Sequence, residues 1–141
     1  METTNKIFLK VENIIVAPID KVWAYWTLPE HITKWNFASD DWHTPHAAND
    51  LRKGGSFTAR MEAKDGSFGF DFAGVYDEVQ NNKYIEYTAC DGRKVKIDFL
   101  AEGGKTKISE SFEPESENPH ELQKAGWQAI MNNFKKYTEA N

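Results

Sequence analysis

Residues 83–113 read KYIEYTACDGRKVKIDFLAEGGKTKISESFE, and their pattern indicates the fold more clearly than any other part of the chain. Two pairs of turn-forming residues, Asp91-Gly92 and Gly103-Gly104, divide this stretch into three runs of alternating apolar and polar residues. Such pairs are typical of tight hairpins, whose central residues need positive φ angles. The stretch therefore predicts three antiparallel strands joined by hairpins.

The same pattern extends toward the N-terminus. Asp65-Gly66 and Asn81-Asn82 are two further hairpin signals. Together the four turns predict a five-strand antiparallel meander. The expected strands lie at about 55–64, 67–80, 83–90, 93–102 and 105–113.

The run at 67–80 is unusually long and rich in phenylalanine. Phe68, Phe70 and Phe72 alternate with polar residues or glycine, so we expect them to share the inner face of the sheet. Gly69 and Gly74 lie within the same run, and we expect them to let this strand bend.

The segment before the meander combines a strand with two short helices. Residues 7–16 are rich in β-branched and apolar types and predict a strand. Pro18 suits the first turn of a helix, and Thr27 to Glu30 forms a T-x-x-E capping signal for a second one that ends near Trp35. Residues 36–50 show no clean period and predict a loop.

The C-terminal segment predicts one long helix. Asn118 is a good N-cap, Pro119 suits the first helical position, and the pattern continues to about Thr138. The expected apolar stripe consists of Leu122, Gly126, Ala129, Ile130, Asn133, Phe134 and Tyr137, with Trp127 and Met131 on its flank.

Length and composition agree with one globular unit. The chain has 141 residues, of which 40% are hydrophobic and 28% charged, and we expect a single domain over residues 1–141. The order of elements predicts an α+β fold, in which a curved antiparallel sheet of about six strands wraps around the C-terminal helix. A curved sheet and a straight helix do not meet everywhere, so a cavity is expected between them.

Charge and cysteine content indicate which partners and which cellular compartment to expect. A net charge of −5 argues against nucleic acid as the main partner, and no apolar run is long enough for membrane insertion. Cys90 is the only cysteine, so no intrachain disulfide can form. With no apolar leader at the start of the sequence, these features predict a cytoplasmic protein.

Several short stretches also carry a family resemblance. They are Ala17-Pro18 with Val22-Trp23, Leu28-Pro29-Glu30 with Trp35, Asp50 to Gly55, Asp65-Gly66, Gly74-Val75-Tyr76, and Gly126-Trp127 with Phe134 to Tyr137. Over about residues 10–139 the chain resembles the activator of Hsp90 ATPase homologue 1-like family. That family is part of the START-like, Bet v 1-like superfamily (SRPBCC), which also holds the polyketide cyclases.

The resemblance implies a helix-grip fold with a hydrophobic cavity under the C-terminal helix. Members of the superfamily bind lipids, polyketides or other apolar molecules, and a similar eukaryotic domain serves an Hsp90 co-chaperone. That co-chaperone has a second, preceding domain for which this chain has no room, so chaperone interaction is not expected. The matching positions shape the fold, and none of them is a catalytic signature.

Glu110 is the residue that stands out on the predicted inner face. In the run from Lys105, the positions of Thr106, Ile108 and Phe112 should face inward, and Glu110 shares their register. A buried carboxylate is costly unless it is paired, so Glu110 is a candidate for orienting a ligand or accepting a proton. The alternative is that a frayed strand end or a bulge turns its side chain to solvent.

Alternation and stripe position also predict the wall of the cavity. The expected wall residues are Phe57, Met61, Phe70, Phe72, Ile97, Phe99, Trp127 and Met131. The alternative is that these aromatic side chains fill the space completely. Trp42 and His43, in the expected loop at 36–50, could close over the mouth of the cavity as a lid and contact the ligand.

No metal or cofactor site is predicted. His43 and His46 lie near Asp40 and Asp41, but an H-x-x-H spacing in an unpatterned loop is a weak metal signal. Lys53-Gly54-Gly55 is not a phosphate-binding loop, because neither the full motif nor a following helix is present.

These observations favour a non-enzymatic protein that binds an apolar or aromatic small molecule. One alternative is an enzyme of the cyclase or dehydratase type that uses Glu110 and His43 as acid and base. Another is a module that interacts with Hsp90-type chaperones, which would need an exposed apolar patch in place of a deep pocket. The sequence leaves the formation of a homodimer open.

Overall fold

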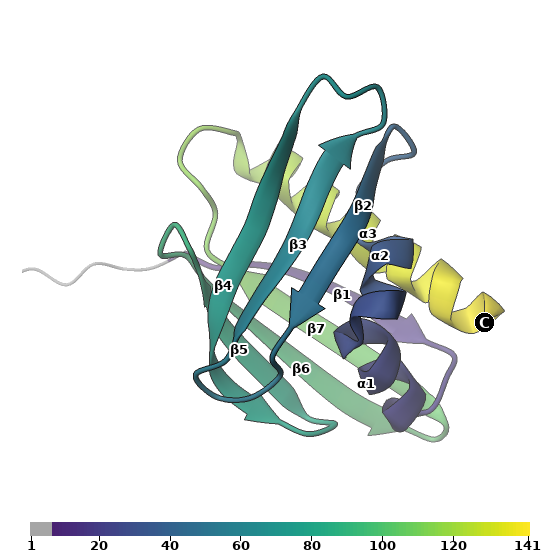
Figure 1. Cartoon of the computed structure of the whole chain (residues 1–141). Coiled ribbons are helices and arrows are strands. Elements are labelled where there is room, and N and C mark those ends of the chain that lie inside the picture. The colour runs from purple at the N-terminus through teal and green to yellow at the C-terminus, as the bar shows by residue number, and fades with distance from the viewer. Residues whose placement is uncertain (1–6) are drawn as a thin grey trace, which may run out of the picture.

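A strongly curved antiparallel sheet forms the body of the molecule, with helices on its inner side (Figure 1). The structure is a computed structural model and describes residues 7–141. Its elements are β1 (Leu9–Ile15), α1 (Ile19–Thr27), α2 (Pro29–Trp35), β2 (Trp42–Asn49), β3 (Ser56–Ala63), β4 (Gly69–Gln80), β5 (Tyr84–Ala89), β6 (Lys94–Glu102), β7 (Lys105–Phe112) and α3 (His120–Ala140).

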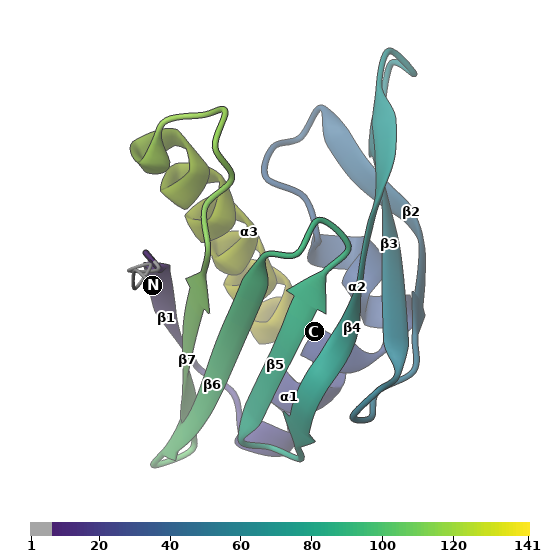
Figure 2. The same ribbon diagram turned by 90° about the vertical axis from the view of Figure 1, so that its left-hand side faces the viewer.

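The strands follow the order β1-β7-β6-β5-β4-β3-β2, and every neighbouring pair is antiparallel. Strands β3 to β7 are the expected meander, and β1 pairs with its last strand. The long helix α3 crosses the concave side of the sheet, as Figure 2 shows. The predicted α+β helix-grip fold is confirmed, with seven strands in place of six among residues 7–141.

The additional strand is β2, which lies where the sequence predicted a loop. It is an edge strand that pairs only with β3, and its register shifts between His43 and His46. Pro45 lies inside this irregular stretch and has no N–H to donate, so it is tolerated at an edge but breaks the sequence pattern of a strand. The prediction of a loop over the whole of residues 36–50 was therefore wrong, because Trp42–Asn49 form a strand whose sequence pattern is interrupted.

The expected capping residues do not cap their helices. The hydroxyl of Thr27 donates to the carbonyl oxygen of Trp23 in the last turn of α1, at 2.7 Å, so it is not available to α2. The residue at the N-cap of α3 is Pro119, whereas the side chain of Asn118 contacts Glu115 in the preceding loop. The helices themselves lie close to their predicted positions.

The buried face of α3 is rotated from the predicted stripe. Met131 and Phe134 are fully buried, whereas Leu122 is 60% exposed. The helix packs mainly against β1, α1 and α2, so the direction of these elements decides which side is covered. Met131 therefore belongs to the centre of the buried face and not to its flank.

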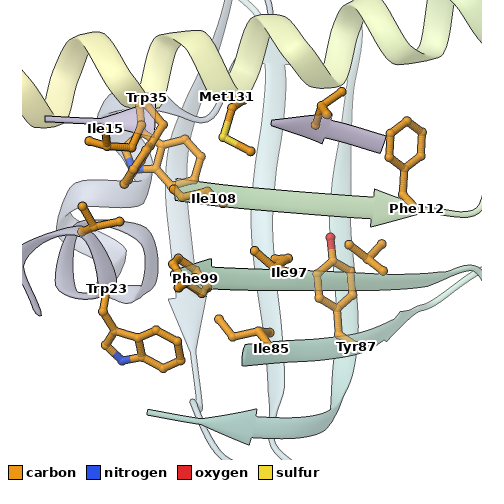
Figure 3. Close-up of a cluster of buried hydrophobic side chains, with 14 of the residues drawn as sticks. Ile15, Trp23, Trp35, Ile85, Tyr87, Ile97, Phe99, Ile108, Phe112 and Met131 are labelled. Carbon is orange, nitrogen blue, oxygen red and sulfur yellow. The ribbon is translucent and has the colours of Figure 1, made fainter. Parts of the chain in front are cut away.

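The solid part of the core lies between the inner faces of β5, β6 and β7 and the helices α1 and α3 (Figure 3). Its largest fully buried side chains include Ile85, Ile97, Ile108, Phe112 and Met131. On β7 every second residue is buried, as the inner-face register of the sequence predicts. Within residues 7–141 no helix is both long and apolar enough to cross a membrane.

The glycines of β4 allow close contacts across the sheet. A Cβ at Gly74 would lie 2.6 Å from the carbonyl oxygen of Thr88 and 2.9 Å from the ring of Phe57. The irregularity of β4 lies further along, where its register against β5 shifts between Tyr76 and Glu78. The register shift therefore lies beyond Gly74, and Gly74 is needed for packing space.

A candidate ligand-binding cavity

A cavity of about 340 Å³ lies between the sheet, α2 and α3. Its walls come from α1, α2, α3 and the inner faces of β2 to β7. The volume is above the lower limit of about 300 Å³ for small-molecule sites. The aromatic residues of the core therefore do not fill all the space between sheet and helix.

Most of the predicted wall residues do line this cavity. They are Phe57, Met61, Phe70, Phe72, Ile97, Glu110 and Trp127. They come from β3, β4, β6, β7 and α3, which are far apart in sequence, so the fold brings them together as alternation predicted.

Two predicted wall residues belong to the solid core instead. The ring of Phe99 packs edge-on against Trp23, with centroids 5.1 Å apart, because α1 covers this end of β6. Met131 is fully buried where α3 packs against its neighbours. The prediction that Phe99 and Met131 face the cavity was wrong, because it took no account of where α1 and α3 lie on the sheet.

Trp42 and His43 do not form a lid. They begin the edge strand β2, where the ring of Trp42 lies 6.0 Å from that of Phe68 and 6.2 Å from that of Phe70. His43 Nε2 lies 3.6 Å from a carboxylate oxygen of Glu62 on the neighbouring strand. Phe68 itself is 60% exposed, which corrects its predicted inward position at the hairpin end of the sheet.

Several residues of the wall were not predicted from the sequence. Trp26, Tyr76, Ile85 and Tyr87 all line the cavity. Ile85 and Tyr87 lie on the buried face of β5, where buried and half-buried residues alternate. The same alternation rule that identified Ile97 would have identified both of them.

Glu110 lies on the inner face of β7, in register with Val11 on β1 and Ile97 on β6. It is 6% exposed, and it has no hydrogen-bond or ion-pair partner among residues 7–141. Burial raises the pKa of its carboxyl group to about 8, because the charged form loses its hydration. The predicted register is confirmed, and the side chain does not turn to bulk solvent.

Tyr87 is the second polar group on this part of the wall. Figure 3 shows its hydroxyl pointing across β6 toward the stretch of β7 between Ile108 and Phe112. Burial raises the pKa of this hydroxyl well above its usual value, and the nearby Glu110 raises it further. Tyr87 is thus neutral, and Glu110 is near enough to act on it electrostatically.

The polar end of the cavity lies beside the β5–β6 hairpin and the loop before α3. Arg93 and Glu115 both line this end. The Arg93 Nε donates to Asp91 at 2.7 Å, and the Gln123 amide donates to the carbonyl oxygen of Glu115 at 3.0 Å. Arg93 therefore has its own carboxylate partner and does not neutralise Glu110.

Another polar group in the wall is already satisfied within the protein. The Tyr76 hydroxyl donates to the Asn49 side chain at 2.6 Å, and the Asn49 amide donates to the carbonyl oxygen of Thr27 at 2.6 Å. These two hydrogen bonds connect β4 to β2 and β2 to the end of α1. Among residues 7–141, the Glu110 carboxyl and the Tyr87 hydroxyl have no such hydrogen-bond partner and also line the cavity.

Comparison with known proteins places the chain in a family. Residues 16–139 match the family described as activator of Hsp90 ATPase homolog 1-like protein. The chain belongs to this family. None of the curated proteins compared with the chain is significantly similar to it.

Solved structures agree with the family assignment. An AHSA1-like protein from Aeromonas hydrophila is 42% identical, with a TM-score of 0.89 over 95% of this chain and 93% of that one. A protein from Cytophaga hutchinsonii is 58% identical, with a TM-score of 0.80 over 98% and 94% of the two chains. A protein from Nitrosomonas europaea shares the fold at 20% identity, with a TM-score of 0.82 over 98% and 97%.

Proposed function

We propose that this protein binds an apolar or aromatic small molecule in the cavity, and that Glu110 anchors the polar part of that molecule. The observation that carries the proposal is a buried carboxyl group with no protein partner in an aromatic wall. Such a group lowers the stability of an empty protein, whereas a polar atom of a ligand can satisfy it.

The alternatives have less support from the geometry. An acid–base pair of Glu110 and His43 is not formed, because His43 lies on the edge strand beside Glu62 and outside the cavity. A chaperone-interacting module would need an exposed apolar surface more than a cavity.

A titration with a neutral apolar fluorophore such as Nile red tests the proposal. Ala59 is a buried wall residue, and Ala59→Leu should fill part of the cavity and weaken dye binding several-fold. Ala101→Leu adds the same atoms at an exposed position of β6 and serves as the matched control. Equal binding to both variants would contradict the proposal.

Native mass spectrometry identifies the natural ligand. Protein purified from its own host should carry a retained small molecule, and Ala59→Leu should carry less of it. A host preparation that is empty, together with no binding of apolar dyes, would contradict a ligand-binding role.

We also propose that the protein functions in the cytoplasm. The support is the lone cysteine, Cys90, which is exposed and has a free thiol, as is typical of proteins from reducing compartments. Cell fractionation that finds the native protein in an exported fraction would contradict this proposal.

A further inference from the structure

Aromatic rings make up a large part of the cavity wall. Five residues of the wall form what we term the aromatic cage: Phe57, Phe72, Tyr76, Tyr87 and Trp127. Each ring lies near another one: the Phe57 and Tyr87 centroids are 4.7 Å apart, and those of Phe72 and Trp127 are 6.5 Å apart. The cage thus spans β3, β4, β5 and α3.

Strand β7, which carries Glu110, also contacts the aromatic cage. Phe112, two residues further along β7 on the same buried face, stacks on Trp127 with centroids 4.0 Å apart and an interplanar angle of 6°. On the other side, Glu110 interacts electrostatically with Tyr87. Glu110 therefore shares the buried face of β7 with the residue that stacks on Trp127, and its charge acts on the Tyr87 hydroxyl.

The lining holds two carboxyl groups and one guanidinium group. Among the described residues that line the cavity, the charged ones are Arg93, Glu110 and Glu115. The one cation, Arg93, is bound to Asp91, and its charge acts on Tyr87 and Glu115. The residues that pair with Glu110 on β1 and β6 are Val11 and Ile97, which carry no charge.

Resting on the proposed function, we propose that the ligand is an organic cation: an apolar or aromatic body with one ammonium group, held between the aromatic cage and the carboxylate of Glu110. Aromatic faces attract cations through the negative charge above the ring, and desolvated sites strengthen this attraction. A buried carboxylate without a counter-ion completes such a site, because the ligand supplies the missing positive charge.

A cation at this position changes the protonation of Glu110. In the empty cavity burial keeps the pKa near 8, so at pH 7 the carboxyl is mostly protonated. An ammonium group beside it favours the carboxylate and lowers its pKa. Binding therefore releases about one proton to the buffer for each cation bound near pH 7. A neutral ligand releases none.

The test compares two compounds of the same shape, phenyltrimethylammonium and tert-butylbenzene. We expect the cation to bind more tightly, and calorimetry at pH 7 in phosphate and in Tris should show the release of about one proton. For Glu110→Gln we expect about ten-fold weaker binding of the cation, no proton release, and little change for the neutral compound.

Two further variants separate charge from packing. Glu102→Gln makes the same change at an exposed end of β6, outside the cavity, and should leave both affinities unchanged. Phe72→Leu keeps an apolar side chain at this position but removes one aromatic ring. Binding of the cation should therefore weaken several-fold, and binding of the neutral compound should weaken less.

The outcomes distinguish this inference from the proposed function. Tighter binding of tert-butylbenzene, or binding of the cation without proton release, would overturn the cation assignment and leave an apolar ligand site in place. Failure of both compounds and of a neutral dye to bind would contradict the ligand-binding role itself, and the cation assignment with it.

Discussion

Glu110 shows how one residue can lower stability and leave an unpaired polar group in the wall of a cavity. A carboxyl group at this position of β7 replaces the apolar residue that the core would accept best. Because no basic side chain pairs with it, the protein avoids burying a charge by keeping the proton. The unpaired acid is therefore ready to interact with whatever enters the cavity.

Glu110 should make stability fall as the pH rises. The folded state holds the proton more tightly, since the pKa is raised from 4.5 to about 8. The stabilisation is complete below about pH 4.5 and is lost as the pH rises through 8, a change on the order of 4 kcal/mol. Urea unfolding of the wild type and of Glu110→Gln at pH 5 and pH 8.5 measures it.

Subtracting the two proteins removes the contribution of groups that both share, including the histidines. The difference in unfolding free energy should change with pH in favour of Glu110→Gln at pH 8.5. A difference that stays constant across this range would show that Glu110 titrates normally. Glu110→Leu should be more stable than the wild type at neutral pH, by roughly 1–4 kcal/mol.

Within the strands and helices, Gly74 and Gly126 differ in the space available for a side chain. A Cβ at Gly74 of β4 would come too close to Thr88 and Phe57, whereas a Cβ at Gly126 of α3 would meet nothing within 4 Å. Gly74 is therefore required by packing across the sheet. Gly126 lies inside a helix, where glycine is less favourable than alanine.

The substitutions Gly74→Ala and Gly126→Ala should consequently change stability in opposite directions. We expect Gly74→Ala to lower the free energy of unfolding by about 1–3 kcal/mol, because Phe57 and the strand backbone must move. We expect Gly126→Ala to raise it by about 0.5–1 kcal/mol. Thermal and urea unfolding of both variants measure this, and shifts of the same sign would contradict the argument.

Most strands, but not all, could be predicted from the sequence. Alternation and turn residues predicted β3 to β7, because each hairpin is a local structure with its own signal. The edge strand β2 was missed because Pro45 and the register shift near it interrupt its period. Local patterns do not record which strand an irregular segment will pair with.

The residues of the candidate site also differ in how well the sequence predicts them. Glu110 was identified because a charged residue in an apolar register is visible in the sequence itself. Phe99 and Met131 were assigned to the wrong environment, since an inner-face position can meet either a helix or a cavity. That choice depends on where α1 and α3 pack on the sheet, which involves contacts between distant parts of the chain.

In the whole molecule the helices do not cover the sheet evenly. Where the helices contact the sheet, α1 lies mainly against β6 and β7, α3 against β1, and α2 against β2. The largest fully buried side chains of the sheet lie mainly on β1 and on β5 to β7. On β2 and β3 the buried residues are Thr44 and Ala59. The cavity lies between a densely packed half of the sheet and a less buried half.

This division predicts two levels of local stability. Amide hydrogens of β6 and β7 should exchange only through global unfolding, because opening these strands exposes the main core. Amides of β2 and β3 should exchange through smaller openings that leave β6 and β7 intact. Native-state hydrogen exchange at increasing urea concentrations distinguishes the two classes.

A ligand in the cavity tests whether opening of the less buried half disrupts the binding site. It contacts residues of β3 and β4 on one side and Glu110 and Trp127 on the other, so it joins the less buried half to the core. Openings of β2 to β4 should therefore release the ligand, so the free energy of these openings should rise on ligand binding by the same amount as that of global unfolding, which β6 and β7 report. A smaller gain for β2 to β4 than for β6 and β7 would show that these strands open while the ligand stays bound.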